Sequence, residues 1–471
     1  MAGTVTWDGS TSTDSSVAAN WTVTSGSPST PPGSGDHVII PDDSTTDNDC
    51  TLVTSYTWGS LLIESGGSIT TTSVKTVSLD GGGVADIFKN LGTITGDLNI
   101  NLVSSSDGNI HSAGSGNIKD LTINRASTTF TLTNACTVDN DLTVTAGTLD
   151  TNSVSDYALT VTGDVSVTGT LTGNASAISV GSLWINAGGT YSATSGTTTV
   201  TSAKSNFAIS NSGTFTHNNG TVTISGGSNQ WLNNGPYYNL ISNNDSSIGL
   251  GLSANVTVAN DLTVNASKNL GWVSSQYTLT VTEDVICNGY LNKYNSASTT
   301  GACSFGSLTI ASGGTYYATS GTTTITGGNS STGYTFKNAG TFTHNSGKVL
   351  VDFTPSQNWY MQCNEYYDLE IKYNNNDYFS YVTDQSGSAI AVLGDLTVTN
   401  GAFEVYTAGD TLDIHGNTFI NGGVFEYNAD QTGQITHHGL VTLNSGEYKL
   451  NSGQTVKVGG FRKVGGTLTI A

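Results

Sequence analysis

Three aspartates could supply the carboxyl groups that hydrolytic chemistry requires. Asp141, Asp261 and Asp395 each stand directly before a Leu-Thr-Val segment. Enzymes that cut polysaccharides pair two carboxyl groups, one acting as an acid and the other as a base or nucleophile. None of the three has a second carboxylate at a fixed spacing, and the same context recurs around all of them. Because a catalytic site should interrupt a repeat rather than recur with it, the pattern favours a structural role in turns.

Histidines and cysteines are candidate metal ligands, but their spacing in the sequence does not place several of them at one site. His217 and His344 each precede an Asn-containing turn, and His437-His438 is the only adjacent pair. An imidazole site needs several converging ligands. Five cysteines lie far apart without a Cys-x-x-Cys pair: Cys50, Cys136, Cys287, Cys303 and Cys363. We expect buried thiols, with a Cys287–Cys303 disulfide left open, no metal site and no cofactor.

An acidic run from Asp42 to Asp49 offers carboxylates that calcium prefers. It lacks the central glycine and closing glutamate of an EF-hand loop, and no calcium-binding glycine-aspartate repeats follow it. A solvated loop is the favoured interpretation.

The densest aromatic stretch is the candidate ligand or partner surface. It contains Trp359, Tyr360, Tyr366, Tyr367, Tyr373, Tyr378, Phe379 and Tyr381. Exposed tyrosine and tryptophan on a rigid scaffold can stack on sugar rings or anchor a protein interface. The alternative is a larger core, because Trp231 and Tyr237-Tyr238 echo the pattern earlier in the chain.

The net negative charge of the chain argues against negatively charged partners. The formal net charge is -21, with only 14 lysines and arginines in 471 residues. Nucleic acids and anionic membranes need clustered positive charge, so we expect neither as a partner. No apolar run is long enough to span a bilayer, and the segment from Met1 to Trp7 lacks the features of a signal peptide.

Internal repeats decide the architecture. The segments Gly59–Gly67, Gly181–Gly189 and Gly306–Gly314 each contain a short apolar alternation closed by a Gly-Gly turn. They belong to a super-repeat of roughly 120 to 135 residues built from shorter rungs. Helical periodicity is nowhere sustained. We therefore predict an all-β fold, a parallel β-helix (β-solenoid), with a string of β-sandwich domains as the rival.

Two segments are expected. Residues 1–49 contain Trp7, Trp21 and most of the prolines, which suits an N-terminal cap that covers the first rung. Residues 50–471 form the solenoid with its internal super-repeats.

The first 70 or so residues carry a family resemblance. The motifs Trp7-Asp8-Gly9-Ser10, Ala19-Asn20-Trp21 and Asp36 to Pro41, followed by Ser60-Leu61-Leu62-Ile63 and a Gly-Gly turn, resemble the start of repetitive β-solenoid proteins. That group includes bacterial surface adhesins and proteins of marine tailed-phage virions. The resemblance implies a virion or surface protein and carries over no catalytic residue.

The sequence therefore predicts a non-catalytic structural β-solenoid of a virion or cell-surface assembly, acting as an appendage, fibre or decoration. The alternative is a glycan-binding adhesin or receptor-binding protein that uses the exposed aromatics. Expected partners are other copies of the chain, other virion or surface proteins, or host glycans, at the virion surface or outside the cell.

Overall fold

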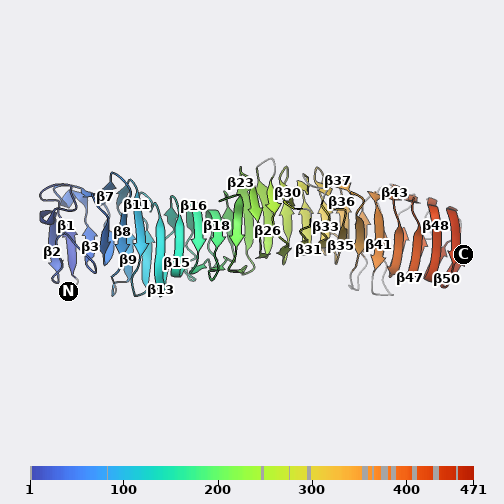
Figure 1. Cartoon of the computed structure of the whole chain (residues 1–471), viewed down its shortest axis with the longest axis horizontal. Coiled ribbons are helices and arrows are strands. Elements are labelled where there is room, and N and C mark those ends of the chain that lie inside the picture. The colour runs from blue at the N-terminus through green and yellow to red at the C-terminus, as the bar shows by residue number, and fades with distance from the viewer. Residues whose placement is uncertain are drawn as a thin grey trace. The chain divides into compact units, whose positions relative to one another are not determined.

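The computed structural model describes residues 3–470 except 82, 246–248, 275, 294–298, 353–358, 363–364, 373–379, 383–388, 406–410, 428–433 and 452–454. It divides into two compact units, Met1–Gly226 and Gly227–Ala471. The division falls inside the predicted solenoid, and the boundary proposed at residue 49 stays a prediction. In Figure 1 the strands of each unit lie side by side as successive rungs.

The unit Met1–Gly226 contains the 3-10 helices η1 (Ala18–Asn20) and η2 (Asp43–Thr45) and the strands β1 (Thr4–Trp7), β2 (Trp21–Ser25), β3 (His37–Ile40), β4 (Cys50–Leu52), β5 (Tyr56–Trp58), β6 (Ser60–Ile63), β7 (Ser68–Thr71), β8 (Lys75–Leu79), β9 (Asp86–Asn90), β10 (Thr93–Thr95), β11 (Leu98–Leu102), β12 (Gly108–Ser112), β13 (Leu121–Leu132), β14 (Cys136–Val138), β15 (Leu142–Asp150), β16 (Leu159–Val167), β17 (Thr170–Thr172), β18 (Ile178–Ile185), β19 (Thr190–Ser192), β20 (Thr197–Val200), β21 (Phe207–Asn211), β22 (Thr214–Thr216) and β23 (Thr221–Gly226).

The unit Gly227–Ala471 contains β24 (Gln230–Leu232), β25 (Pro236–Tyr237), β26 (Asn239–Asn244), β27 (Leu250–Leu252), β28 (Val256–Val258), β29 (Leu262–Val264), β30 (Asn269–Trp272), β31 (Leu279–Cys287), β32 (Tyr290–Leu291), β33 (Cys303–Ile310), β34 (Thr315–Tyr317), β35 (Thr322–Ile325), β36 (Tyr334–Asn338), β37 (Thr341–Thr343), β38 (Lys348–Val351), β39 (Trp359–Gln362), β40 (Glu365–Tyr366), β41 (Asp368–Lys372), β42 (Ser380–Val382), β43 (Ala389–Val392), β44 (Leu396–Asn400), β45 (Ala402–Val405), β46 (Thr411–Ile414), β47 (Thr418–Tyr427), β48 (Gln434–Leu450), β49 (Thr455–Lys463) and β50 (Thr467–Ile470).

The predicted all-β parallel solenoid is confirmed, with about 17 turns. No α-helix lies among the residues that the structure describes. In that part of the chain no helix is long and apolar enough to cross a membrane.

In-register parallel pairing stacks like residues on like. In the first unit Leu149 pairs with Leu171, and Leu171 pairs with Tyr191. All three side chains are fully buried, so they form an inward ladder. The outward neighbours Thr148 and Thr170 pair in the same way and stay partly exposed. The alternation of apolar and hydroxyl residues in the sequence therefore sets the inner and outer faces.

The predicted repeat copies adopt the same local structure. Strands β18 and β33, which contain the starts of Gly181–Gly189 and Gly306–Gly314, have identical patterns of buried residues. Both copies also bury a tyrosine whose hydroxyl hydrogen-bonds a threonine, at 2.7 Å for Tyr191 with Thr198 and 2.9 Å for Tyr316 with Thr323.

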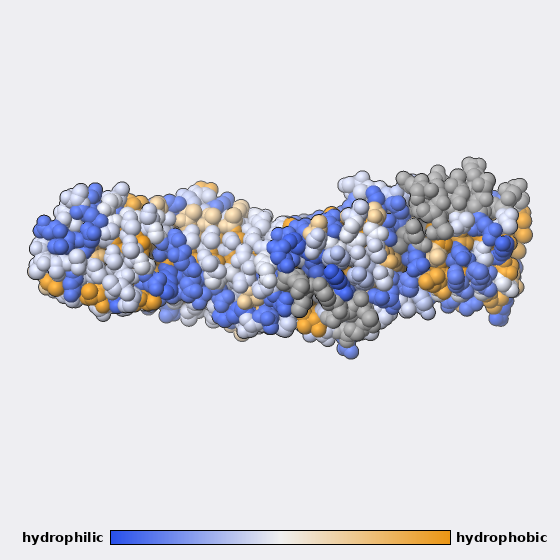
Figure 2. Space-filling model, turned by 90° about the horizontal axis from the view of Figure 1, so that it is seen from above, coloured by the Kyte–Doolittle hydropathy of each residue, from blue (hydrophilic) through white to orange (hydrophobic). Residues whose placement is uncertain are grey.

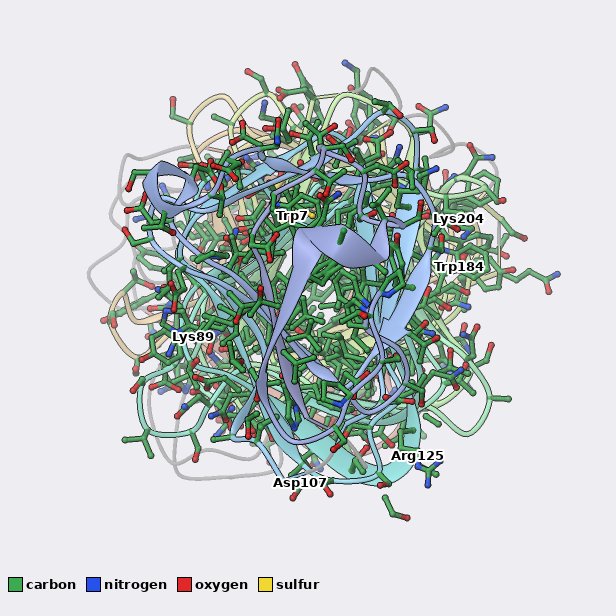
Figure 3. The ribbon with its side chains drawn as sticks, turned by 90° about the vertical axis from the view of Figure 1, so that its left-hand side faces the viewer. Trp7, Lys89, Asp107, Arg125, Trp184 and Lys204 are labelled. Carbon is green, nitrogen blue, oxygen red and sulfur yellow. The ribbon has the colours of Figure 1, made fainter. Side chains whose placement is uncertain are left out.

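The segment that begins the first unit packs three tryptophans. Trp7 and Trp21 lie with ring centroids 5.0 Å apart, and Trp21 and Trp58 lie 6.1 Å apart. Seen end-on in Figure 3, Trp7 lies over the interior rather than at the rim where Asp107 and Arg125 project. Strand β1 pairs antiparallel with β2 and parallel with β3, so it joins the stack, and a capping role for residues 1–49 stays a prediction.

Candidate functional site

The three recurring aspartates hold the backbone of the following rung. Asp141, Asp261 and Asp395 each precede a strand, and each accepts a hydrogen bond through Oδ1. The donors are the backbone N–H groups of Asp164 at 2.8 Å, Asp284 at 3.1 Å and Asn417 at 2.7 Å. A backbone N–H group that lies between two rungs needs a hydrogen-bond acceptor, and these carboxylates supply it.

On other rungs, uncharged asparagine side chains make the same kind of contact through their amide oxygens. Asn239 Oδ1 accepts from the N–H of Asp261 at 3.3 Å, and Asn417 Oδ1 accepts from the N–H of Leu440 at 3.1 Å. The role therefore requires an oxygen acceptor rather than a negative charge. These contacts match the structural role in turns that the sequence favoured.

One hollow brings two carboxylates near each other. Asp120 and Asp141 line it together with asparagine and threonine side chains. Asp120 Oδ1 accepts from Asn140 Nδ2 at 2.7 Å and from the N–H of Asp141 at 3.1 Å. Both carboxylates thus accept hydrogen bonds from the scaffold, Asp120 from the N–H of Asp141 and Asp141 from the N–H of Asp164.

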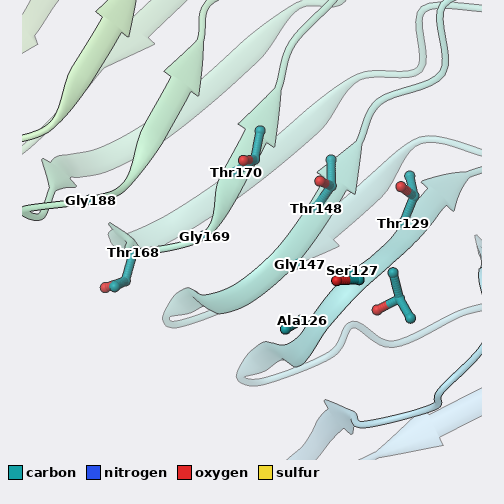
Figure 4. A pocket seen from close by; sticks show the side chains of 10 residues that line it. Ala126, Ser127, Thr129, Gly147, Thr148, Thr168, Gly169, Thr170 and Gly188 are labelled. Carbon is teal, nitrogen blue, oxygen red and sulfur yellow. The ribbon is translucent and has the colours of Figure 1, made fainter.

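A second hollow consists of hydroxyl and backbone groups. Thr129, Thr148 and Thr170 lie on neighbouring strands along it, and Figure 4 shows their hydroxyls with Gly147 in β15 and Gly188 in a turn. None of its lining residues ionises. This surface can offer hydrogen bonds to a polar partner.

The predicted aromatic surface divides between interior and exterior. Trp359 and Tyr366 are buried in the core, whereas Tyr360 and Tyr367 are half-buried. Tyr367 stacks on His344 with ring centroids 5.6 Å apart. Tyr381 lies in β42, paired with Tyr360. Tyr373 and Tyr378 lie outside the described residues, and ligand binding by this stretch stays a prediction.

The described cysteines are buried free thiols. They are Cys50, Cys136, Cys287 and Cys303, so Cys287 and Cys303 are not joined. Burial raises the pKa of Cys136 and of Cys303 to about 12. Since the thiolate is the form that attacks substrates and binds metals, these groups are inert near neutral pH. Cys363 lies outside the described residues.

Two aspartates of the acidic run accept hydrogen bonds from backbone N–H groups. Asp42 accepts from the N–H of Ser44 at 2.8 Å and caps η2. Asp43 accepts from the N–H of Ser68 at 3.0 Å. The Asp42 contact is local, whereas the Asp43 contact links the run to the start of β7.

Two histidines have matching turn roles in the two repeat copies. His217 Nδ1 accepts from the N–H of Asn219, and His344 Nδ1 accepts from the N–H of Ser346, both at 3.0 Å. These imidazoles help to close the turns that follow them.

His437 and His438 are adjacent in strand β48, so their side chains lie on opposite faces. His437 is buried, with Nδ1 2.7 Å from Thr418 Oγ1 and Nε2 2.9 Å from the hydroxyl of Tyr448, and burial lowers its pKa to about 4. His438 points outward and meets Asp413 and His415, two residues that the sequence did not single out.

The strands β49 and β50 form an exposed edge. Among the residues that the structure describes, each pairs with β48 alone. Several of their apolar side chains, and that of the turn between them, are exposed: Val458, Phe461, Val464, Leu468 and Ile470. Figure 2 shows apolar residues gathered where these strands lie. An unpaired edge with apolar side chains is a template for another strand.

Comparison with family models, curated proteins and solved structures gave no match.

Proposed function

We propose that this chain is a non-catalytic structural β-solenoid that forms part of a larger virion or cell-surface assembly. The observation that carries the proposal is the contact that each recurring aspartate makes with the backbone. Asp141, Asp261 and Asp395 each bind the backbone of the neighbouring rung, as a scaffold requires. A solenoid built in this way spaces or attaches other molecules.

The exposed apolar side chains of β49 and β50 support the assembly role. A formal net charge of -21 makes copies of the chain repel one another, so contacts between them need a locally apolar surface. Phe461 and Leu468 supply such a surface on these two strands.

Native mass measurement with negative-stain imaging over a range of concentrations tests this proposal. We expect the wild-type chain to form larger species as concentration rises, because two such edges can pair. The double variant Phe461→Asp/Leu468→Asp is expected to remain monomeric. The control Val154→Asp, at a side chain that is 88% exposed in the other unit, is expected to behave as wild type. A wild-type chain that stays monomeric at every concentration would contradict self-assembly through this edge.

Glycan binding is the second candidate. The half-buried rings of Tyr360 and Tyr367 favour it, because a partly exposed ring on a rigid strand can stack on a sugar. Specific signals on a glycan array that disappear in Tyr367→Ala would support this function over the assembly role.

A further inference from the structure

One cluster of ionisable side chains on the outer face has no part in the scaffold contacts above. Asp413 lies in β46, His415 follows directly after that strand, and His438 lies in β48. The two strands pair in parallel, with Asp413 opposite Thr436 and Ile414 opposite the buried His437. Because side chains alternate along a strand, the positions flanking Ile414 and His437 face outward. The register therefore sets His438 beside His415.

The three ligand atoms converge. They all lie within 4.8 Å of one another. His438 Nε2 is 2.8 Å from Asp413 Oδ1, and His415 Nε2 is 3.3 Å from Asp413 Oδ2. Two ligand atoms on one tetrahedral zinc ion are about 3.4 Å apart, since each lies about 2.1 Å from the metal. Small rotations of these exposed side chains would give all three atoms that spacing.

We propose that Asp413, His415 and His438 form a binding site for a divalent transition-metal ion, with Zn²⁺ as the ion that this donor set favours. Two imidazole nitrogens and one carboxylate oxygen are typical zinc ligands, whereas calcium and magnesium prefer oxygen alone. The ion would join two neighbouring rungs through side chains that the backbone does not need.

Three protein ligands leave one tetrahedral position open. A hollow beside the cluster is lined by Asp413, His438 and Lys457 among others. The ammonium group of Lys457 favours an anion rather than a neutral group at the open position. The ligand that completes the site is therefore expected to be anionic, such as a carboxylate of another molecule or a small inorganic anion.

Calorimetric titration of the tag-free, chelator-treated full chain with Zn²⁺ tests the site. We expect one ion per chain, with a dissociation constant on the order of micromolar, because only three exposed ligands bind it. His415→Gln and His438→Gln are each expected to weaken binding by more than about a hundredfold, since even loss of an outer-shell partner costs up to that factor. The matched control His217→Gln, which alters a turn histidine in the other unit, is expected to bind as wild type.

Cobalt provides a second measurement that does not depend on affinity alone. Co²⁺ bound by two imidazoles and a carboxylate in a four-coordinate site is expected to give visible absorption bands, which Asp413→Asn should alter. Circular dichroism of each variant checks that the fold is kept. A wild-type chain that binds no Zn²⁺, or a double variant His415→Gln/His438→Gln that binds it as tightly as wild type, would overturn the proposal.

Discussion

Leu171→Asp is expected to lower the free energy of unfolding of the unit Met1–Gly226 by about 5 kcal/mol or more. Leu171 is fully buried between Leu149 and Tyr191 on the neighbouring rungs. The substitution removes a buried leucine and places a carboxylate among apolar side chains. Either the charge is buried or the rungs open around it, and both outcomes cost stability.

The matched control is Thr170→Asp, one residue earlier on the same strand. Thr170 faces outward between Thr148 and Thr190 and is partly exposed. We expect a change of about 0.5 kcal/mol or less, because a surface substitution disturbs no core contact. Urea unfolding followed by circular dichroism measures both variants. Equal losses for Leu171→Asp and Thr170→Asp would contradict the assigned inward and outward faces.

Gly147→Ala is expected to be the second most destabilising change, by about 4 kcal/mol. Gly147 has a φ of +80°, and a Cβ there would lie 2.2 Å from the carbonyl oxygen of Arg125 and 2.9 Å from that of Thr128. An alanine must therefore both adopt a left-handed backbone conformation and displace the neighbouring rung.

Gly188 separates these two effects. Its φ is +84°, but a Cβ there would meet no atom within 4 Å. Gly188→Ala is expected to cost only about 1 kcal/mol, the penalty of the left-handed conformation alone. Urea or thermal unfolding of both variants provides the comparison. If Gly188→Ala were as costly as Gly147→Ala, close stacking of the rungs at Gly147 would not be the cause.

The architecture could be predicted because the sequence repeats. Gly181–Gly189 and Gly306–Gly314 show the alternation and the Gly-Gly turn of a rung, and both copies have the predicted local structure. Period-two alternation identifies the buried face without knowledge of the neighbours. The structural role of Asp141 followed from the same reasoning, since its context recurs.

The surface neighbours could not be predicted, because they depend on the length of each rung. Asp413, His415 and His438 meet only because Ile414 pairs in register with His437. A rung longer or shorter by one residue would turn His438 inward. The sequence shows the alternation within a rung but not the number of residues in the turns that connect one rung to the next.

The inward and outward rings of the aromatic stretch also could not be assigned from the sequence. Trp359-Tyr360 and Tyr366-Tyr367 are adjacent pairs, so one ring of each pair must face the core. The structure buries Trp359 and Tyr366 and leaves Tyr360 and Tyr367 partly exposed. Which member of each pair faces inward depends on the register with the neighbouring strands, which the sequence alone does not specify.

Amide hydrogen exchange of Asp141→Ala and Asp141→Asn tests most directly whether the recurring carboxylates act as structural acceptors. Asp141 Oδ1 accepts from the N–H of Asp164 at 2.8 Å, and asparagine retains an oxygen at that position. We expect exchange around Asp164 to become about tenfold to a hundredfold faster in Asp141→Ala, because the amide loses its acceptor. Asp141→Asn should exchange nearly as slowly as wild type. Unchanged exchange in Asp141→Ala, or equally fast exchange in both variants, would contradict the structural role of these aspartates.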